Sequence, residues 1–344
     1  MPISAEAVPM SALGRTLRAI LAWHSMLILI LAGCSPRESS KSIVVYSSVD
    51  EAYSRPLSRM FEERTGIRVK LVSDTEAAKS AGLVTRLLEE RDHPQADLFW
   101  SGDLMRALDL ARAGVAEPAL PPVQGPGRLR VLIRHRVPGA NRGDAPGSVL
   151  DLAKPEFASR SCLANPLFGT TSMHAAVLLQ IYGPEGAERF FNDFARNGGR
   201  MLASNGEVKR RVGSGEFEFG LTDSDDANVA LLDGMPVSVI VPDQGPEAVG
   251  AVMLPTAVLH VAGAPHPKDA AAFAGFLGAA ETTRWMAESS AAFFPPNDPG
   301  YAPGKLEISL DKVKLLRIDH DDLGVQFENW RQTFLEPWVR DQQL

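Results

Sequence analysis

Short apolar segments that alternate with amphipathic segments constrain the fold of this chain more than any other feature. Residues 43–46 and 96–100 are apolar runs of strand length, whereas the apolar positions of residues 78–91 repeat at helical spacing. This alternation is typical of a β-sheet that is covered by helices. We therefore predict an α/β fold.

The predicted elements fall into two series along the chain. In the first, strands alternate with helices at residues 43–46, 50–64, 67–72, 78–91, 96–100 and 103–113. In the second, the same alternation runs through residues 161–164, 170 onward, 185–196, 217–222, 225–232 and 237–242. A strand at 128–133 leaves the first series and a long apolar strand at 252–261 returns to it. We therefore predict two lobes, with the chain crossing between them twice and a cleft between them. Such clefts close on ligands by hinge motion.

These patterns set the predicted boundaries of the lobes. Helical spacing also continues near the end of the chain, so we expect a C-terminal helical segment there. The predicted divisions are residues 43–134 with 248–290 for lobe 1, 135–247 for lobe 2, and 291–344 for the C-terminal segment.

Residues 1–33 have the layout of a bacterial lipoprotein signal peptide. Arg15 and Arg18 precede an apolar stretch that ends in Leu-Ala-Gly directly before Cys34. Cys34 is the predicted lipidation site, and the Ser-rich residues 34–42 suit a flexible tether to a membrane. We expect a periplasmic or extracytoplasmic location. The alternative is a short buried helix with an incidental cysteine, and Met10 is an alternative start.

The composition excludes several classes of function. The net charge is −7 without a basic cluster, which argues against nucleic acid as a partner. If Cys34 carries lipid, Cys162 has no disulfide partner and is expected in the core. Nucleophile-elbow, Walker A and Rossmann motifs are absent, as is zinc-ligand spacing among the histidines. We therefore expect no enzymatic activity and no resident cofactor.

Polar residues stand where the predicted strands end and helices begin. Open α/β sheets bind ligands beyond the carboxyl ends of their strands, and helix N-termini there hold anions. The alternative for each residue is an ordinary helix cap, which is an equal alternative for Asn205. The candidate ligand-binding residues are Ser47, Ser48, Thr75, Ser101, Thr170, Thr171, Asn205, Thr222, Asp223 and Asp225.

Three carboxylates cluster at one of these strand-to-helix junctions. Asp223, Asp225 and Asp226 offer oxygen ligands that suit a hard cation such as Fe³⁺ or Ca²⁺, or an ammonium group. They are the candidate metal ligands. The alternative is that Asp225 and Asp226 charge the first turn of a helix and face water.

Several segments resemble the iron(III)-type extracellular solute-binding proteins of ABC importers. The resemblance covers about residues 41–290 and is carried by "VVYSSVDEAYSRPL", "FEERTGIRV", "DTEAAKSAGLVTRLLEERDHPQADLFWSGD", "ANPLFGTT", "FGLTDSDDA" and "GAPHPKDAAAFAGFL". It implies a two-lobed periplasmic-binding-protein fold of type II, the hinged "Venus flytrap". It also implies ABC permease subunits as partners and Fe³⁺ as a transported ligand. We expect a monomer.

The chain departs from that family at the metal site. Ferric-binding relatives hold iron with adjacent tyrosines, but Tyr46, Tyr53, Tyr182 and Tyr301 are all separate in this sequence. The resemblance therefore leaves the ligand open between ferric iron with a partner anion and a small anionic solute. A sensor that uses the same cleft for signalling and a two-lobed lipoprotein enzyme are the alternative functions.

Overall fold

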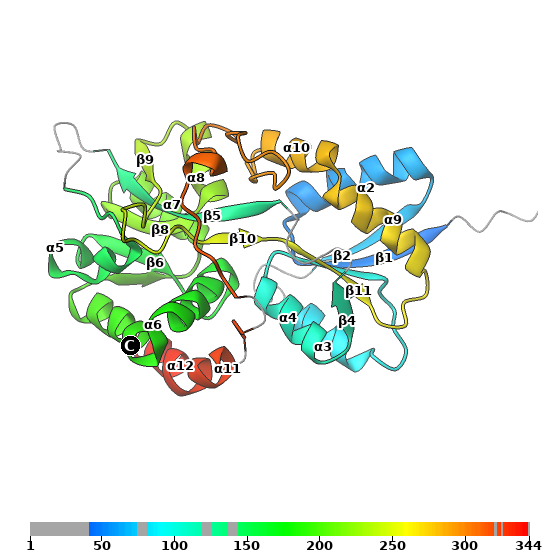
Figure 1. Ribbon diagram of the computed structural model, residues 1–344, viewed down its shortest axis with the longest axis horizontal. Helices are drawn as coiled ribbons and strands as arrows, with labels where there is room; N and C mark the ends of the chain where they lie inside the picture. Colours follow the sequence, from blue (N-terminus) through cyan, green and yellow to red (C-terminus); the bar gives the residue numbers. More distant parts are fainter. Residues whose placement is uncertain are drawn as a thin grey trace, which may run out of the picture. The chain divides into compact units, whose positions relative to one another are not determined.

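Two mixed β-sheets, each with helices on both faces, form the framework of the protein (Figure 1). The computed structural model describes residues 41–73, 81–118, 126–136, 144–319, 322–324 and 326–342. Ser42–Leu344 forms one compact unit. Cys34 and most of its predicted tether lie outside the described residues. Among the helices in the described part of the chain, none is both long and apolar enough to cross a membrane.

The first sheet has the strand order β2-β1-β3-β11-β4. Its strands are β1 (Ser42–Ser47), β2 (Arg68–Ser73), β3 (Leu98–Ser101), β4 (Ala116–Pro118) and β11 (Ala257–Val261). Strand β1 pairs in parallel with β2 and β3, whereas β11 runs antiparallel to β3 and β4. We call this sheet with its helices the first lobe.

The helices of the first lobe cover the two faces of its sheet. They are α2 (Glu51–Thr65), α3 (Ala81–Glu89), α4 (Leu104–Arg112), α9 (Pro267–Gly278) and α10 (Ala280–Glu288). Ile43 and Val45 pack with α2, α9 and α10, whereas Tyr46 packs with α3 and α4. The alternation of side chains along β1 therefore separates two apolar layers.

Local sequence explains where these helices begin and end. The carboxylate of Asp50 accepts a hydrogen bond from the backbone N–H of Ala52 at 2.9 Å and caps α2. Helix α2 ends at Gly66, whose φ of 71° is the left-handed conformation that glycine adopts readily. Asp103 caps α4 through the N–H groups of Met105 and Arg106.

The second sheet has the order β10-β5-β8-β6-β7, with β9 also paired to β5. Its strands are β5 (Gly127–His135), β6 (Ser161–Ala164), β7 (Arg200–Leu202), β8 (Phe219–Asp223), β9 (Val237–Ile240) and β10 (Met253–Pro255). Strand β5 is antiparallel to its three neighbours, whereas β6 is parallel to β7 and β8. We call this sheet with its helices the second lobe.

Helices also cover both faces of the second sheet. They are η2 (Val149–Ala153), α5 (Pro155–Ala158), α6 (Gly169–Arg196), α7 (Asn205–Gly213) and α8 (Ser224–Leu232). Helix α6 is interrupted at Gly183, whose φ of 66° and ψ of 177° are not helical. This break agrees with the two helices predicted for this stretch. Cys162 is fully buried among apolar side chains, as expected from the sequence.

The strands that join the lobes differ from the prediction. We expected residues 128–133 to leave the first lobe, but β5 pairs with strands of the second sheet. The apolar run 252–261 is not one strand, because β10 belongs to the second sheet and β11 to the first. An apolar run indicates burial but not the sheet in which it is buried. The chain passes between the sheets after β4 and again after β10, as predicted, and it returns to the second lobe a further time after α10.

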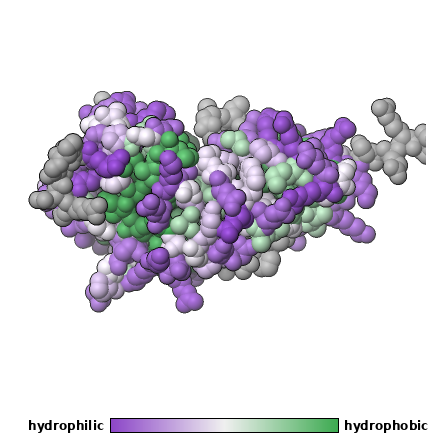
Figure 2. Space-filling model, turned by 90° about the horizontal axis from the view of Figure 1, so that it is seen from above, coloured by the Kyte–Doolittle hydropathy of each residue, from purple (hydrophilic) through white to green (hydrophobic). Residues whose placement is uncertain are grey.

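The C-terminal segment is less helical than expected. From residue 291 to residue 324 the described part contains a single helical turn, η3 (Leu310–Lys312). The helices α11 (Phe327–Trp330), η4 (Arg331–Leu335) and α12 (Glu336–Asp341) then follow. Aromatic rings from this segment pack on Phe191 of α6. Figure 2 shows hydrophobic side chains gathered on one face, over elements of the second lobe.

Candidate functional site

A buried ion pair lies at the center of the predicted site in the second lobe. Arg130 on β5 is directly opposite Asp223 at the end of β8, and their side chains pair. The Arg130 side chain is 0% exposed and that of Asp223 is 3% exposed. A buried arginine requires a carboxylate and further hydrogen bonds to offset its loss of hydration. The strand register therefore supplies the partner that Arg130 needs.

Three predicted ligand-binding residues complete this network. The Arg130 guanidinium donates to Thr170 Oγ1 at 3.1 Å and to Thr171 Oγ1 at 3.3 Å. Thr170 donates to Asp223 Oδ2 at 2.6 Å, and Asn205 Nδ2 donates to the same oxygen at 3.0 Å. Thr170 and Thr171 stand in the first turn of α6, and Asn205 is the first residue of α7. The fold thus brings four candidates together, namely Thr170, Thr171, Asn205 and Asp223.

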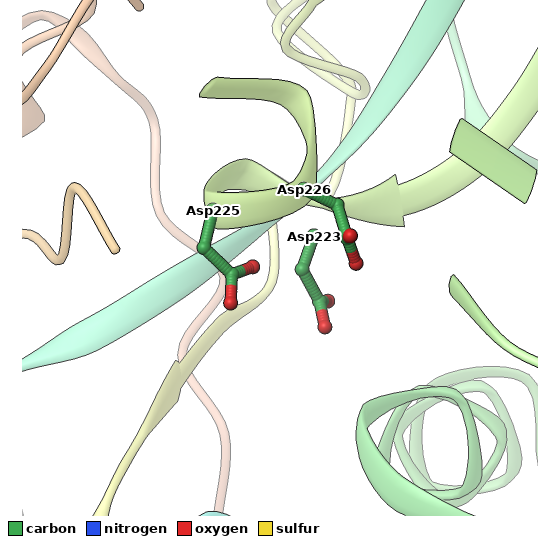
Figure 3. A group of neighbouring side chains, drawn as sticks. All are labelled: Asp223, Asp225 and Asp226. Carbon is green, nitrogen blue, oxygen red and sulfur yellow. The ribbon is translucent and has the colours of Figure 1, made fainter. Parts of the chain in front are cut away.

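The three carboxylates of the acidic cluster project from the junction of β8 and α8 (Figure 3). Oxygen atoms of Asp223, Asp225 and Asp226 lie within 4.8 Å of one another. Each of the two outer carboxylates also faces a cation. Asp225 Oδ2 is 3.4 Å from Arg128 Nη1, and Asp226 Oδ1 is 3.4 Å from Lys209 Nζ. With Arg130 beside Asp223, the cluster is balanced in charge.

Burial and mutual repulsion shift the outer carboxylates toward their protonated forms. Loss of hydration raises the pKa of Asp225 to about 7, against the opposing effect of Arg128. The pKa of Asp226 is also raised, first by burial and then by the charge of Asp223, while Lys209 opposes the shift. We therefore expect the cluster to carry less negative charge than three free aspartates.

The candidate hydroxyls of the first lobe are mostly used in local turns. Ser47 is fully buried, and its Oγ accepts from the N–H of Val49 at 3.2 Å. Ser101 is also fully buried and exchanges hydrogen bonds with the backbone of Asp103. Ser48 is half-buried, with its Oγ 3.1 Å from Ser101 Oγ and 3.2 Å from the N–H of Gly102. Ser48 is thus the candidate in this group that keeps some exposure.

Other candidates lie away from this network or outside the description. Thr222 precedes Asp223 on β8, so strand alternation turns its side chain to the opposite face of the sheet. Its Oγ1 is 3.4 Å from the carbonyl of Asn205. The cap of α7 is Ser204, and Asn205 instead joins the network. Thr75 lies outside the described residues.

Two arginines of the candidate site were not foreseen from the sequence. Arg128 and Arg130 stand at alternate positions that share one face of β5, a strand that also carries Arg134 and His135 at its other end. Charged residues inside a buried strand are rare unless they are paired. Arg130 within a buried strand and Asp223 at the end of another strand are the sequence features that predict an internal ion pair.

His174, one turn after Thr171 on α6, is buried. Burial lowers its pKa to about 3, and the charge of Arg130 adds to this effect. A neutral imidazole beside a buried guanidinium avoids repulsion between two cations. Arg130 is therefore charged and His174 is neutral beneath the first turn of α6.

The fold and the site define a two-lobed α/β protein with polar groups gathered on both lobes. Polar groups of the second lobe converge at the start of α6 and α8, and polar groups of the first lobe lie at the end of β3. The family model for bacterial extracellular solute-binding proteins matches residues 42–289. The chain belongs to this family, as the sequence resemblance implied, and membership places it outside the cytoplasm.

Known proteins share the fold at low sequence identity. Iron-bound HitA from Pseudomonas aeruginosa has a TM-score of 0.73 at 19% identity, covering 88% of this chain and 100% of that protein. AfuA from Actinobacillus pleuropneumoniae, solved with exogenous fructose-6-phosphate, has a TM-score of 0.70 at 19% identity, covering 89% and 100%. An uncharacterized protein from Haemophilus influenzae is 21% identical, covering 92% of this chain and 96% of the relative. These likenesses confirm the predicted two-lobed α/β fold.

Proposed function

We propose that the protein is the lipid-anchored substrate-binding component of an ABC importer and that it closes its lobes over a small anionic solute. The observation that carries this proposal is the charge balance of the acidic cluster. Arg130, Arg128 and Lys209 face the three carboxylates, so the cluster already has its cations. A bare cation would compete with these residues, whereas an anion meets the partly exposed Arg128 and a helix N-terminus.

The start of α6 is the proposed position of the anionic group. The first backbone N–H groups of a helix have no partner within the helix, and the helix dipole favors negative charge there. Phe168 occupies the N-cap position and provides no side-chain cap. The hydroxyls of Thr170 and Thr171 stand at the same place, above the buried Arg130. The N–H groups of this first turn supply donors for an oxyanion, while the Thr170 and Thr171 hydroxyls bind Arg130, Asp223 and Asn205 beneath it.

The anchor completes the proposal. Acyl chains on Cys34 would hold the protein at a membrane surface without a membrane-spanning helix. The polar residues after Cys34 would then let the two-lobed unit reach a permease subunit in the same membrane. We expect the receptor to act as a monomer.

Ferric iron with a partner anion is the second candidate ligand. The observation in its favor is the approach of three carboxylates to within 4.8 Å of one another. Oxygen ligands at this spacing suit a hard cation. Iron would have to displace Arg128 and Lys209 from Asp225 and Asp226, and the anion at α6 would offset part of its charge.

A thermal-shift screen of the full-length protein in detergent tests the proposal. The ligands are inorganic phosphate, fructose 6-phosphate, 2-aminoethylphosphonate, citrate and ferric citrate. A ligand present at a hundred times its Kd stabilises the folded state by about 2.7 kcal/mol. The melting temperature of the protein must therefore rise when such a ligand binds. We expect stabilisation by at least one anion without iron, and loss of it in Thr171→Val but not in Thr333→Val, which removes an exposed hydroxyl. Stabilisation by ferric citrate alone would favor ferric iron as the ligand.

A further inference from the structure

Arg128 is the arginine beside the acidic cluster that solvent can reach. It stands near the start of β5, and its side chain is 18% exposed, compared with 0% for Arg130. Its Nη1 lies 3.4 Å from Asp225 Oδ2 and 3.9 Å from Asp223 Oδ2. The guanidinium carbon also lies 5.0 Å from the ring centroid of Phe293, which holds the group in place by a cation–π contact.

The same side chain touches the first lobe. A Cβ at Gly102 would lie 3.0 Å from Arg128 Nη2 and 3.9 Å from the carbonyl oxygen of Ser48. Gly102 follows β3, and its N–H donates to Ser48 Oγ. Arg128 therefore lies between the half-exposed hydroxyl of the first lobe and the carboxylates of the second. A group bound to its guanidinium would be in contact with both lobes.

The two arginines differ in how completely they are engaged. Arg130 has Asp223, Thr170, Thr171 and Asn205 around its two terminal nitrogens, all within the buried network. Arg128 holds Asp225 through a single contact of 3.4 Å, longer than the 2.7–2.9 Å of a well-formed charge-assisted hydrogen bond. The other oxygen of Asp225, Oδ1, is buried and has no hydrogen-bond partner among the described residues. The contact between Arg128 and Asp225 is therefore weak, and it leaves one oxygen of Asp225 without a hydrogen bond in the described part of the chain.

We propose that Arg128 is the residue that binds the solute's anionic group across the two lobes, and that Asp225 is an internal competitor which holds Arg128 until the solute arrives. The proposal rests on the proposed function, because it assumes that an anion enters this cleft. Asp225 then sets a threshold for binding. A ligand must offer an oxyanion that engages the guanidinium better than one long carboxylate contact does.

This arrangement selects the chemical class of the ligand. Arginine binds planar carboxylates and phosphoryl groups through two parallel hydrogen bonds, and such bidentate pairs are stronger than single contacts. A monovalent spherical anion has no such geometry and gains little by displacing Asp225. Since the bound group also reaches the first lobe, its binding favors the closed arrangement of the lobes.

Measuring the affinity of matched variants tests this role. The full-length protein in detergent is titrated with inorganic phosphate, fructose 6-phosphate, 2-aminoethylphosphonate and citrate by calorimetry. Asp225→Asn removes the competing charge with little change of shape. Asp233→Asn removes the same charge from an exposed position directly after α8 and is the control. Arg128→Gln and Arg128→Lys test the cation, and circular dichroism verifies that each variant is folded.

We expect Asp225→Asn to bind the anion about five- to ten-fold more tightly than Asp233→Asn does. Arg128→Gln should bind at least about ten-fold more weakly than wild type, and Arg128→Lys should recover part of the loss. If an anion binds wild type but Asp225→Asn matches Asp233→Asn, the competitor role is overturned while the proposed function stands. If no variant binds any of the four anions, the proposed function fails and this proposal with it.

Discussion

Arg130 and Asp223 lie opposite each other in the antiparallel pair of β5 and β8, and their side chains form a buried ion pair. The pair is enclosed by hydroxyl and amide groups from α6 and α7. Its position links the second sheet to the two helix N-termini that build the proposed site. Asp223, predicted as a metal or solute ligand, thus also has a structural partner.

Removing one member of this pair should be costly. We expect Asp223→Asn to lower the free energy of unfolding by about 3–5 kcal/mol, because it leaves the Arg130 charge buried without a counterion. Urea denaturation followed by circular dichroism measures the loss. The double variant Arg130→Met/Asp223→Leu should regain most of it, since it removes both charges. A loss below about 1 kcal/mol in Asp223→Asn would contradict the assigned pairing.

Asp103 should make stability depend on pH. Burial raises the pKa of Asp103 from 3.8 to about 6, so the folded state binds this proton more tightly than the unfolded state. Its contribution to stability is therefore greatest below pH 4 and is lost as pH rises through 6. Asn also caps helices, so Asp103→Asn should be more stable than wild type at pH 7 by up to about 3 kcal/mol.

Urea denaturation of both proteins from pH 4 to pH 8 measures this effect. The difference in the free energy of unfolding between Asp103→Asn and wild type should fall toward zero near pH 4, because Asp103 is protonated in the folded state there. A difference that does not change with pH would show that the carboxyl does not titrate in this range.

Phe191 should hold the C-terminal helices on α6. It is 2% exposed, and its ring lies 5.1 Å from that of Trp338 and 6.2 Å from that of Trp330. We expect Phe191→Ala to cost about 3–5 kcal/mol because it leaves a cavity among these rings. Hydrogen exchange should then speed up in residues 327–341 more than in β1. Leu88→Ala, at a side chain that is 40% exposed, should stay within about 0.5 kcal/mol of wild type.

The two cysteines should behave differently toward thiol reagents. Cys162 is fully buried, and burial raises the pKa of its thiol, so it should react only after unfolding. If Cys34 carries lipid, protein extracted from membranes should show no reactive thiol when native and one in urea. Two reactive thiols in urea would argue against acylation. Cys34→Ser should release the protein from the membrane fraction.

Sequence patterns were sufficient for much of the fold. The apolar runs at residues 43–46, 96–100 and 161–164 are strands, and Gly66 ends a helix where its conformational freedom predicts. Burial periodicity is local, so it can be read along the chain. The assignment of β5 and β10 to the second sheet could not be read in this way, because strand pairing depends on contacts between distant segments.

The sequence by itself determined the α/β class, the family resemblance and the polar residues at the helix starts. Tertiary structure alone decided which of them share a site. It brought Thr170, Thr171, Asn205 and Asp223 around Arg130, and turned Thr222 to the other face of the sheet. The reason is that charge compensation acts between side chains far apart in sequence. Only the register of β5 against β8 places two arginines beside an acidic cluster that, in the sequence, stands alone.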